Sequence, residues 1–149
     1  MNRLAIRTSL ALFLTAFVSS AATAADEAPR CSERTLRGRY VFSASGFTIV
    51  AGVTVPKAII EVIDFNGDGT LSVPGATRSL NGVITRSLPS VGTYTVTEDC
   101  VGTITFAGPT FDIFVSPRGN EFWLIQTNPD NVFQGSATRT FREFGNRDR

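Results

Sequence analysis

The sequence predicts an all-β protein: an eight- or nine-stranded antiparallel up-and-down barrel that follows a cleaved signal peptide. Three observations support this fold class. The stretch from Gly38 to Phe141 is rich in Thr, Val, Ile, Phe and Tyr, which favour strands. Gly, Pro, Asn and Asp interrupt it at short intervals, as turns require. Finally, no run of eight or more residues after the signal peptide shows a helical period.

Taken in order, the apolar and β-branched runs predict nine strands. They cover residues 38–48, 58–65, 70–73, 79–86, 92–97, 101–107, 110–116, 121–127 and 132–141. Most connections are short and have turn composition, such as residues 66–69, 117–120 and 128–131. Short connections make successive strands pair antiparallel as a meander. One helical turn is expected earlier, at residues 32–36, with Ser32 as its cap.

Closure of the meander into a barrel removes both exposed sheet edges. A sandwich is the competing arrangement, but it needs longer crossover connections than this chain offers. An outer-membrane barrel is disfavoured because most of the expected strands are shorter than the 9–11 residues that span a bilayer. We therefore expect no transmembrane segment in the mature chain.

The N-terminal 24 residues have the pattern of an export signal. Arg3 and Arg7 precede a short apolar core at residues 10–18, and Ala22 and Ala24 form a small-residue cleavage site. The expected organisation is a signal peptide at 1–24, a polar leader at 25–36, a barrel domain at 37–142 and a charged tail at 143–149. The protein is then expected in the periplasm or outside the cell.

Charge and composition exclude several classes of function. Loss of Arg3 and Arg7 with the signal peptide changes the formal net charge from +1 to −1, which gives no electrostatic reason to expect nucleic acid as a partner. The chain contains no His, so a Ser-His-Asp triad cannot form. It also lacks a metal-ligand cluster and a nucleotide-binding loop, and no cofactor or metal is expected.

Cys31 and Cys100 are the only cysteines. In an oxidising compartment an isolated pair favours a disulfide. It would close a loop of about 70 residues and stabilise the fold by roughly 4 kcal/mol. A catalytic thiol is disfavoured because no His is present to activate it.

Aromatic side chains are the main candidates for a binding site. In the predicted strands they alternate with other residues, so that several share one face. Such rows either line a cavity for an apolar ligand or fill the barrel as a solid core. The candidate lining residues are Tyr40, Phe42, Glu61, Tyr94, Phe106 and Trp123.

Two carboxylates within strands are candidates for acid–base chemistry. In a strand, Glu61 and Asp112 each share a face with the residues two positions away. Each carboxylate would point inward if that face lines the barrel interior. The alternative is that both lie on the solvent face. Lys57, the only lysine, follows Pro56 and is expected in a loop.

Residues 64–70 read Asp-Phe-Asn-Gly-Asp-Gly-Thr, which matches the first half of a calcium-binding loop. The twelfth position of that motif should be Glu, and here it is Gly75. The segment is therefore expected to be a tight hairpin.

Several motifs resemble those of small exported bacterial β-barrel proteins of unknown role. They are Gly-x-Tyr-x-Phe at 38–42, Gly-Thr-Tyr-x-Val at 92–96 and Asp-Cys-x-Gly-Thr at 99–103, with further matching segments at 65–71 and 135–139. This group is similar to the allene oxide cyclase and lipocalin-like (calycin) barrels. The resemblance implies a calycin-like barrel and carries over no catalytic residue.

These observations lead to one main functional hypothesis and two alternatives. The main hypothesis is a binding module for a small apolar ligand, held against the aromatic rows. The first alternative is a barrel enzyme of the cyclase or isomerase kind, which would bring Glu61 or Asp112 together with a Tyr in the interior. The second is a structural or interaction protein of the cell envelope, with a solid core and an exposed apolar patch.

Overall fold

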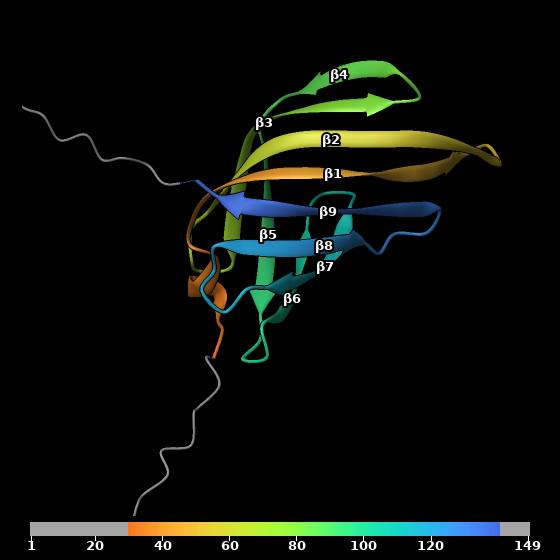
Figure 1. The fold of residues 1–149 in the computed structure, drawn as a ribbon. Helices are drawn as coiled ribbons and strands as arrows, with labels where there is room; N and C mark the ends of the chain where they lie inside the picture. The colour runs from red at the N-terminus through yellow and green to blue at the C-terminus, as the bar shows by residue number, and fades with distance from the viewer. Residues whose placement is uncertain (1–29, 141–149) are drawn as a thin grey trace, which may run out of the picture.

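The computed structural model describes residues 30–140, which form one short 3₁₀ helix and nine β-strands (Figure 1). The helix is η1 (Glu33–Leu36). The strands are β1 (Gly38–Val50), β2 (Val53–Phe65), β3 (Thr70–Leu80), β4 (Val83–Ser87), β5 (Ser90–Val96), β6 (Val101–Thr105), β7 (Thr110–Val115), β8 (Glu121–Gln126) and β9 (Asn131–Arg139). The expected signal peptide at 1–24, the start of the leader and the tail at 143–149 lie outside the described residues.

Eight of the strands close into an antiparallel barrel, as the sequence predicts. The pairing runs β2, β1, β9, β8, β7, β6, β5, β3, and the ring closes where β3 pairs with β2. β4 is an additional strand that pairs with the second half of β3, while the first half of β3 pairs with β5. The β1–β2 and β3–β4 hairpins extend side by side beyond the shorter strands (Figure 1).

Two turns differ from the sequence-based expectation. Residues 79–86, expected as one strand, contain the turn between β3 and β4, where Asn81 and Gly82 have φ values of 48° and 83°. The turn between β1 and β2 is formed by Ala51 and Gly52, also at positive φ. β2 therefore begins five residues earlier than expected, and Lys57 lies within it rather than in a loop.

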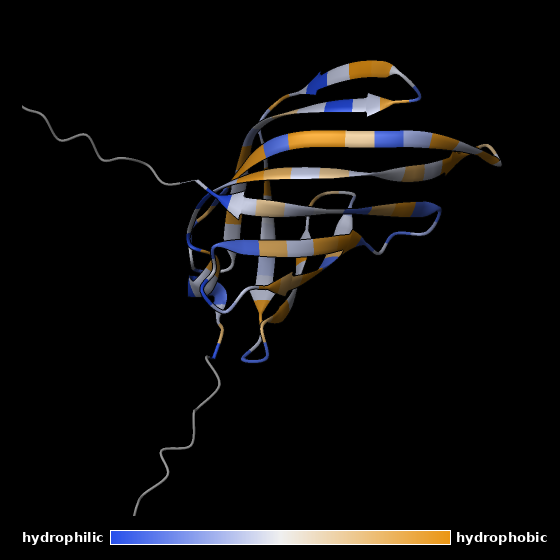
Figure 2. Ribbon diagram, viewed as in Figure 1, coloured by the Kyte–Doolittle hydropathy of each residue, from blue (hydrophilic) through white to orange (hydrophobic). Residues whose placement is uncertain are grey.

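The core follows the two-residue period of the strands. Along β7 the side chains of Phe111, Ile113 and Val115 are buried, while those of Asp112 and Phe114 are exposed. Figure 2 shows hydrophobic and hydrophilic residues following one another along the strands. The interior of the barrel is thus lined by one side-chain row from each of its eight strands.

One end of the barrel is closed by aromatic side chains and by η1. Phe65 lies at the centre of this cluster, with its ring 5.3 Å from that of Tyr40, 4.8 Å from that of Tyr94 and 5.6 Å from that of Phe122. Leu36 of η1 is fully buried against them. The Tyr40 hydroxyl donates a hydrogen bond to the Gly119 carbonyl and accepts others from the Arg139 guanidinium.

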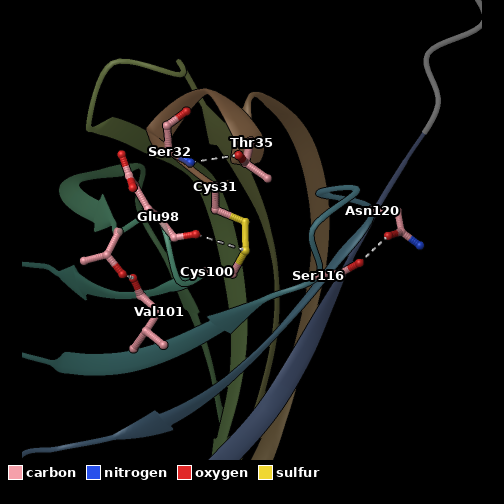
Figure 3. The surroundings of a disulfide bond; sticks show 9 residues. Cys31, Ser32, Thr35, Glu98, Cys100, Val101, Ser116 and Asn120 are labelled. Atoms are coloured by element: carbon pink, nitrogen blue, oxygen red, sulfur yellow. Dashed lines mark hydrogen bonds between the residues drawn. A yellow bond between two sulfur atoms is a disulfide. The ribbon is translucent and has the colours of Figure 1, made fainter. Parts of the chain in front are cut away.

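The Cys31–Cys100 disulfide holds η1 at this closed end, which confirms the predicted pair (Figure 3). The two Cα atoms lie 4.9 Å apart. The Cys31 N–H donates a 3.1 Å hydrogen bond to the Glu98 carbonyl in the turn between β5 and β6. The helical turn forms as expected after Ser32, whose own N–H donates to the Thr35 hydroxyl (Figure 3).

Within residues 30–140, no helix has the length and apolar character to cross a membrane.

Candidate ligand-binding site

The other end of the barrel opens into a cavity of about 420 Å³. Its lining comes from six strands and from the loop between β6 and β7. The lining residues are Phe42, Lys57, Ile59, Glu61, Arg78, Ser90, Val91, Phe106, Ala107, Gly108, Pro109, Phe111 and Phe133. The barrel therefore has one end filled by the aromatic cluster and η1, called the plugged end below, and one end that contains this space, called the open-end cavity.

Four phenylalanine rings contribute to the apolar wall, together with Ile59, Val91, Ala107 and Pro109. Phe42, Phe111 and Phe133 are buried inward-facing residues of β1, β7 and β9. Phe106 follows β6 and meets Phe111 edge to face, with ring centres 6.3 Å apart. Rings from four separate segments thus surround a space that they do not fill.

Lys57 reaches into this cavity from β2. Its Nζ donates a 2.8 Å hydrogen bond to the Gln126 Oε1 and lies 4.1 Å from the centre of the Phe133 ring. Burial, and to a smaller extent the positive charge of Arg78, lower the pKa of Lys57 below its ordinary value. The ammonium group is therefore held in place inside the barrel, without a carboxylate partner among the described residues.

A short hydrogen-bonded chain fixes Gln126, the acceptor for Lys57. The Gln126 Nε2 donates to the Asn128 Oδ1 over 3.0 Å, and that same oxygen accepts a 2.7 Å hydrogen bond from the Thr110 backbone. The Asn128 Nδ2 donates in turn to the Gly108 carbonyl. Sequence reasoning missed Gln126, although its place two residues after Leu124 puts both on the inner face of β8.

Glu61 also faces the cavity, where it pairs across the sheet with Phe42. Burial raises the pKa of its carboxyl from 4.5 to about 7. Within residues 30–140, no ion pair joins Glu61 to Lys57 or Arg78. The carboxyl group therefore changes charge near neutral pH.

Three of the six predicted lining residues meet at this cavity: Phe42, Glu61 and Phe106. Tyr40 and Tyr94 are buried at the plugged end instead, where the Tyr94 hydroxyl donates to the Glu33 carbonyl. The prediction for Trp123 is wrong, because its side chain is 49% exposed on the outer face of β8. Both faces of β8 are apolar, so the sequence pattern did not reveal which one points inward.

The acid–base arrangement considered from the sequence does not form. Asp112 lies on the outer face of β7 and is exposed to solvent, so Glu61 is the only one of the two carboxylates that faces the interior. The hydroxyls of Tyr40 and Tyr94 are engaged at the plugged end. The geometry thus brings no tyrosine to Glu61.

The calcium-like segment forms the expected hairpin between β2 and β3. Asp64 pairs with Arg39 through two hydrogen bonds of 2.7 and 2.6 Å, and the Asp68 carboxylate accepts hydrogen bonds from Thr70. No group of three or more potential metal ligands occurs in the part of the chain that the structure describes.

A second hollow, of about 530 Å³, lies on the outside of the sheet over β1 to β4. Val41, Ile60 and Arg86 contribute to it, and all three are exposed outward-facing residues. Its walls come only from the neighbouring strands β1 to β4, and Glu61 contributes to them as well. The open-end cavity is instead lined by strands from around the barrel.

Fold and site together define a small closed β-barrel with one plugged end and one ligand-sized cavity. Comparison of the chain with protein-family models, curated proteins and solved structures found no match. The similarity to calycin-like and allene oxide cyclase-like barrels stays a prediction from the sequence motifs.

Proposed function

We propose that this protein is a binding module for a small, mainly apolar molecule that occupies the open-end cavity. The observation that carries the proposal is the cavity of about 420 Å³ inside the barrel mouth, walled by four phenylalanine rings and Ile59. Sites for small molecules typically have volumes of about 300–1,000 Å³ and apolar walls with a few polar groups. The cavity meets both criteria.

Burial of apolar surface would supply the binding energy. Each Å² removed from water contributes about 25 cal/mol, before the cost of immobilising the ligand is subtracted. The rigidity of the closed barrel favours binding, since the walls need no rearrangement. The rings of Phe42, Phe111 and Phe133 are already buried in the strands that carry them.

We also propose that the protein works in the periplasm or outside the cell. The signal-type pattern at residues 1–24 and the Cys31–Cys100 disulfide both support export, because disulfides persist in oxidising compartments.

A matched pair of variants tests the binding function. Ile59 and Ile60 are neighbours on β2 with side chains on opposite faces: Ile59 lines the inner cavity and Ile60 the outer depression. Ile59→Trp should fill the cavity, whereas Ile60→Trp leaves it open. The exported protein, purified without detergent, would be assayed by native mass spectrometry and by titration with the neutral fluorophore N-phenyl-1-naphthylamine.

The expected result is binding to the wild type and to Ile60→Trp, with loss of binding in Ile59→Trp. Absence of fluorophore binding to the wild type would contradict the proposal. So would loss of binding in Ile60→Trp alone, which would place the ligand in the outer depression.

One observation favours a second candidate function, an interaction protein of the envelope. Val101, Phe114 and Trp123 lie in register across β6, β7 and β8 on the outer face, with 38%, 56% and 49% of their surfaces exposed. A contiguous apolar row of this kind is typical of contact surfaces. Sedimentation of the wild type and Phe114→Ser would test it, since a contact through this row predicts an association that the variant loses.

A further inference from the structure

Two cations share the open-end cavity. Lys57 of β2 pairs across the sheet with Leu80 of β3, and Ile59 pairs with Arg78. Residues two apart on one strand lie on the same face, so Lys57 and Arg78 are diagonal neighbours that both line the cavity. Burial lowers the pKa of Lys57, and the positive charge of Arg78 adds to this effect.

No acidic residue neutralises these two cations within residues 30–140. The ion pairs there join Arg30 to Glu98 and Arg39 to Asp64, outside the cavity. Glu61 is the one carboxylate among the lining residues. It is also a diagonal neighbour of Arg78 across the β2–β3 pair, but no ion pair in this part of the chain joins it to either cation. Arg78 is exposed to solvent, whereas the Lys57 ammonium group is half-buried and has no counter-ion among the described residues, so an anion beside Lys57 is favourable.

Both cations retain hydrogen-bond donors. The Lys57 ammonium has three N–H groups and gives one to Gln126, and the Arg78 guanidinium has five, none of which is engaged within the described part of the chain. Gln126 and the Phe133 ring hold Lys57 in position. An oxyanion near Lys57 and Arg78 would receive charge-assisted hydrogen bonds, which are stronger than neutral ones.

The rest of the cavity is apolar and of limited size. If each water-sized group takes about 30 Å³, then 420 Å³ accommodates on the order of 14 non-hydrogen atoms. That corresponds to a hydrocarbon chain of about ten carbons with a small head group. The chain would pack against Phe42, Phe111 and Phe133.

We infer that the ligand is an amphiphile with a single anionic head group, such as a medium-chain carboxylic acid, whose head group is bound by Lys57 and Arg78. This inference rests on the proposed binding function and adds the chemical class of the ligand. It makes Lys57 and Arg78 the residues that distinguish acids from neutral molecules of the same length.

Calorimetric titration with decanoate, decanol and decylamine tests the inference, since the three differ only in the head group. The proteins would be the wild type, Lys57→Gln, Arg78→Gln and Arg86→Gln at pH 6. Arg86 is the matched control, because it lies on the outward face of β4 opposite Thr77. Decanol affinity reports whether the cavity is intact in each variant.

The wild type should bind decanoate at least tenfold more tightly than decanol, and decylamine more weakly than both. Lys57→Gln and Arg78→Gln should reduce this preference for the acid several-fold while decanol affinity is retained, and Arg86→Gln should behave as the wild type. Equal affinity for decanoate and decanol would overturn the inference but leave the apolar binding function standing. Failure of all three compounds to bind would overturn both.

Discussion

Lys57 on β2 and Gln126 on β8 meet inside the barrel, where the Lys57 Nζ donates a hydrogen bond of 2.8 Å to the Gln126 Oε1. β1 and β9 lie between these two strands in the sheet, so the contact crosses the interior. Gln126 is only 8% exposed and is the one buried polar residue in the described core. This contact sets the position of a positive charge at the cavity wall.

Gln126→Met should therefore destabilise the protein, because it removes the acceptor of a partly buried ammonium group. Hydrogen bonds to charged groups contribute about 1.5–3 kcal/mol, and a loss of this size in the free energy of unfolding is expected. Gln134→Met is the control, since Gln134 is exposed on β9. Urea unfolding measures both, and equal stabilities of the two variants would contradict the role given to Gln126.

Reduction of the Cys31–Cys100 disulfide should lower the free energy of unfolding by about 4 kcal/mol, because the bond spans 69 residues. The Cys31→Ser, Cys100→Ser double variant should match the reduced wild type. Thermal melts with and without reductant compare them. An unchanged midpoint on reduction would show that η1 is held at the plugged end without the bond.

Gly102→Ala should be strongly destabilising, because a Cβ at this position would lie 1.8 Å from the Thr95 carbonyl oxygen of the paired strand. Overpacking of this kind costs about 1–3 kcal/mol or more. At Gly108, in the loop beside the cavity, an added Cβ meets nothing within 4 Å, so Gly108→Ala should be within about 0.5 kcal/mol of the wild type. Chemical denaturation measures the free energy of unfolding of both variants. Equal values would contradict the close approach of β5 to Gly102.

Stability should depend on pH through Glu61. Burial raises the pKa of its carboxyl from 4.5 to about 7, so the folded protein holds a proton between these values that the unfolded chain has released. The free energy of unfolding should therefore fall as pH rises from 4.5 to 7, by at most about 3 kcal/mol, and then level off. Glu61→Gln should lack this component.

Urea unfolding from pH 4 to 8 measures the difference in the free energy of unfolding between the wild type and Glu61→Gln. Asp112→Asn serves as the control, because the exposed Asp112 carboxylate lies outside the barrel. A difference that does not vary with pH would place the Glu61 carboxyl in water rather than in the cavity.

The fold was largely predictable because short turns and two-residue alternation restrict the pairing. The hairpin at Asn81–Gly82 was missed although Asn-Gly is a strong turn signal, because the apolar residues around it read as one strand. The turn at Ala51–Gly52 was harder to predict, since Ala rarely takes the positive φ of 50° that it has here.

Pro56 explains why Lys57 was expected in a loop. Its carbonyl accepts a hydrogen bond from the Asn81 N–H at the turn that ends β3. The N and O of a strand residue point to the same side, so the missing N–H of Pro56 faces that turn rather than β1. A proline is therefore tolerated within β2, and Lys57 follows it inside the barrel.

The site was only half predictable, because it depends on which strand face points inward. Phe42 and Glu61 follow from the alternation of β1 and β2, whereas β8 is apolar on both faces near Trp123. Its pairing with β7 places Leu124 opposite the buried Ile113, and Trp123 opposite the exposed Phe114. This register is a property of the folded sheet, and no single strand reveals it.

Lys57 offers the most direct test of the binding account, because it is the only lysine in the chain and lies at the cavity wall. Selective ¹³C labelling of its ε-carbon gives one side-chain NMR signal that can be followed while decanoate is added. A bound carboxylate predicts a saturable shift of this signal and a rise in the lowered pKa of Lys57. A Lys57 signal and pKa that stay unchanged at saturating decanoate would contradict the account.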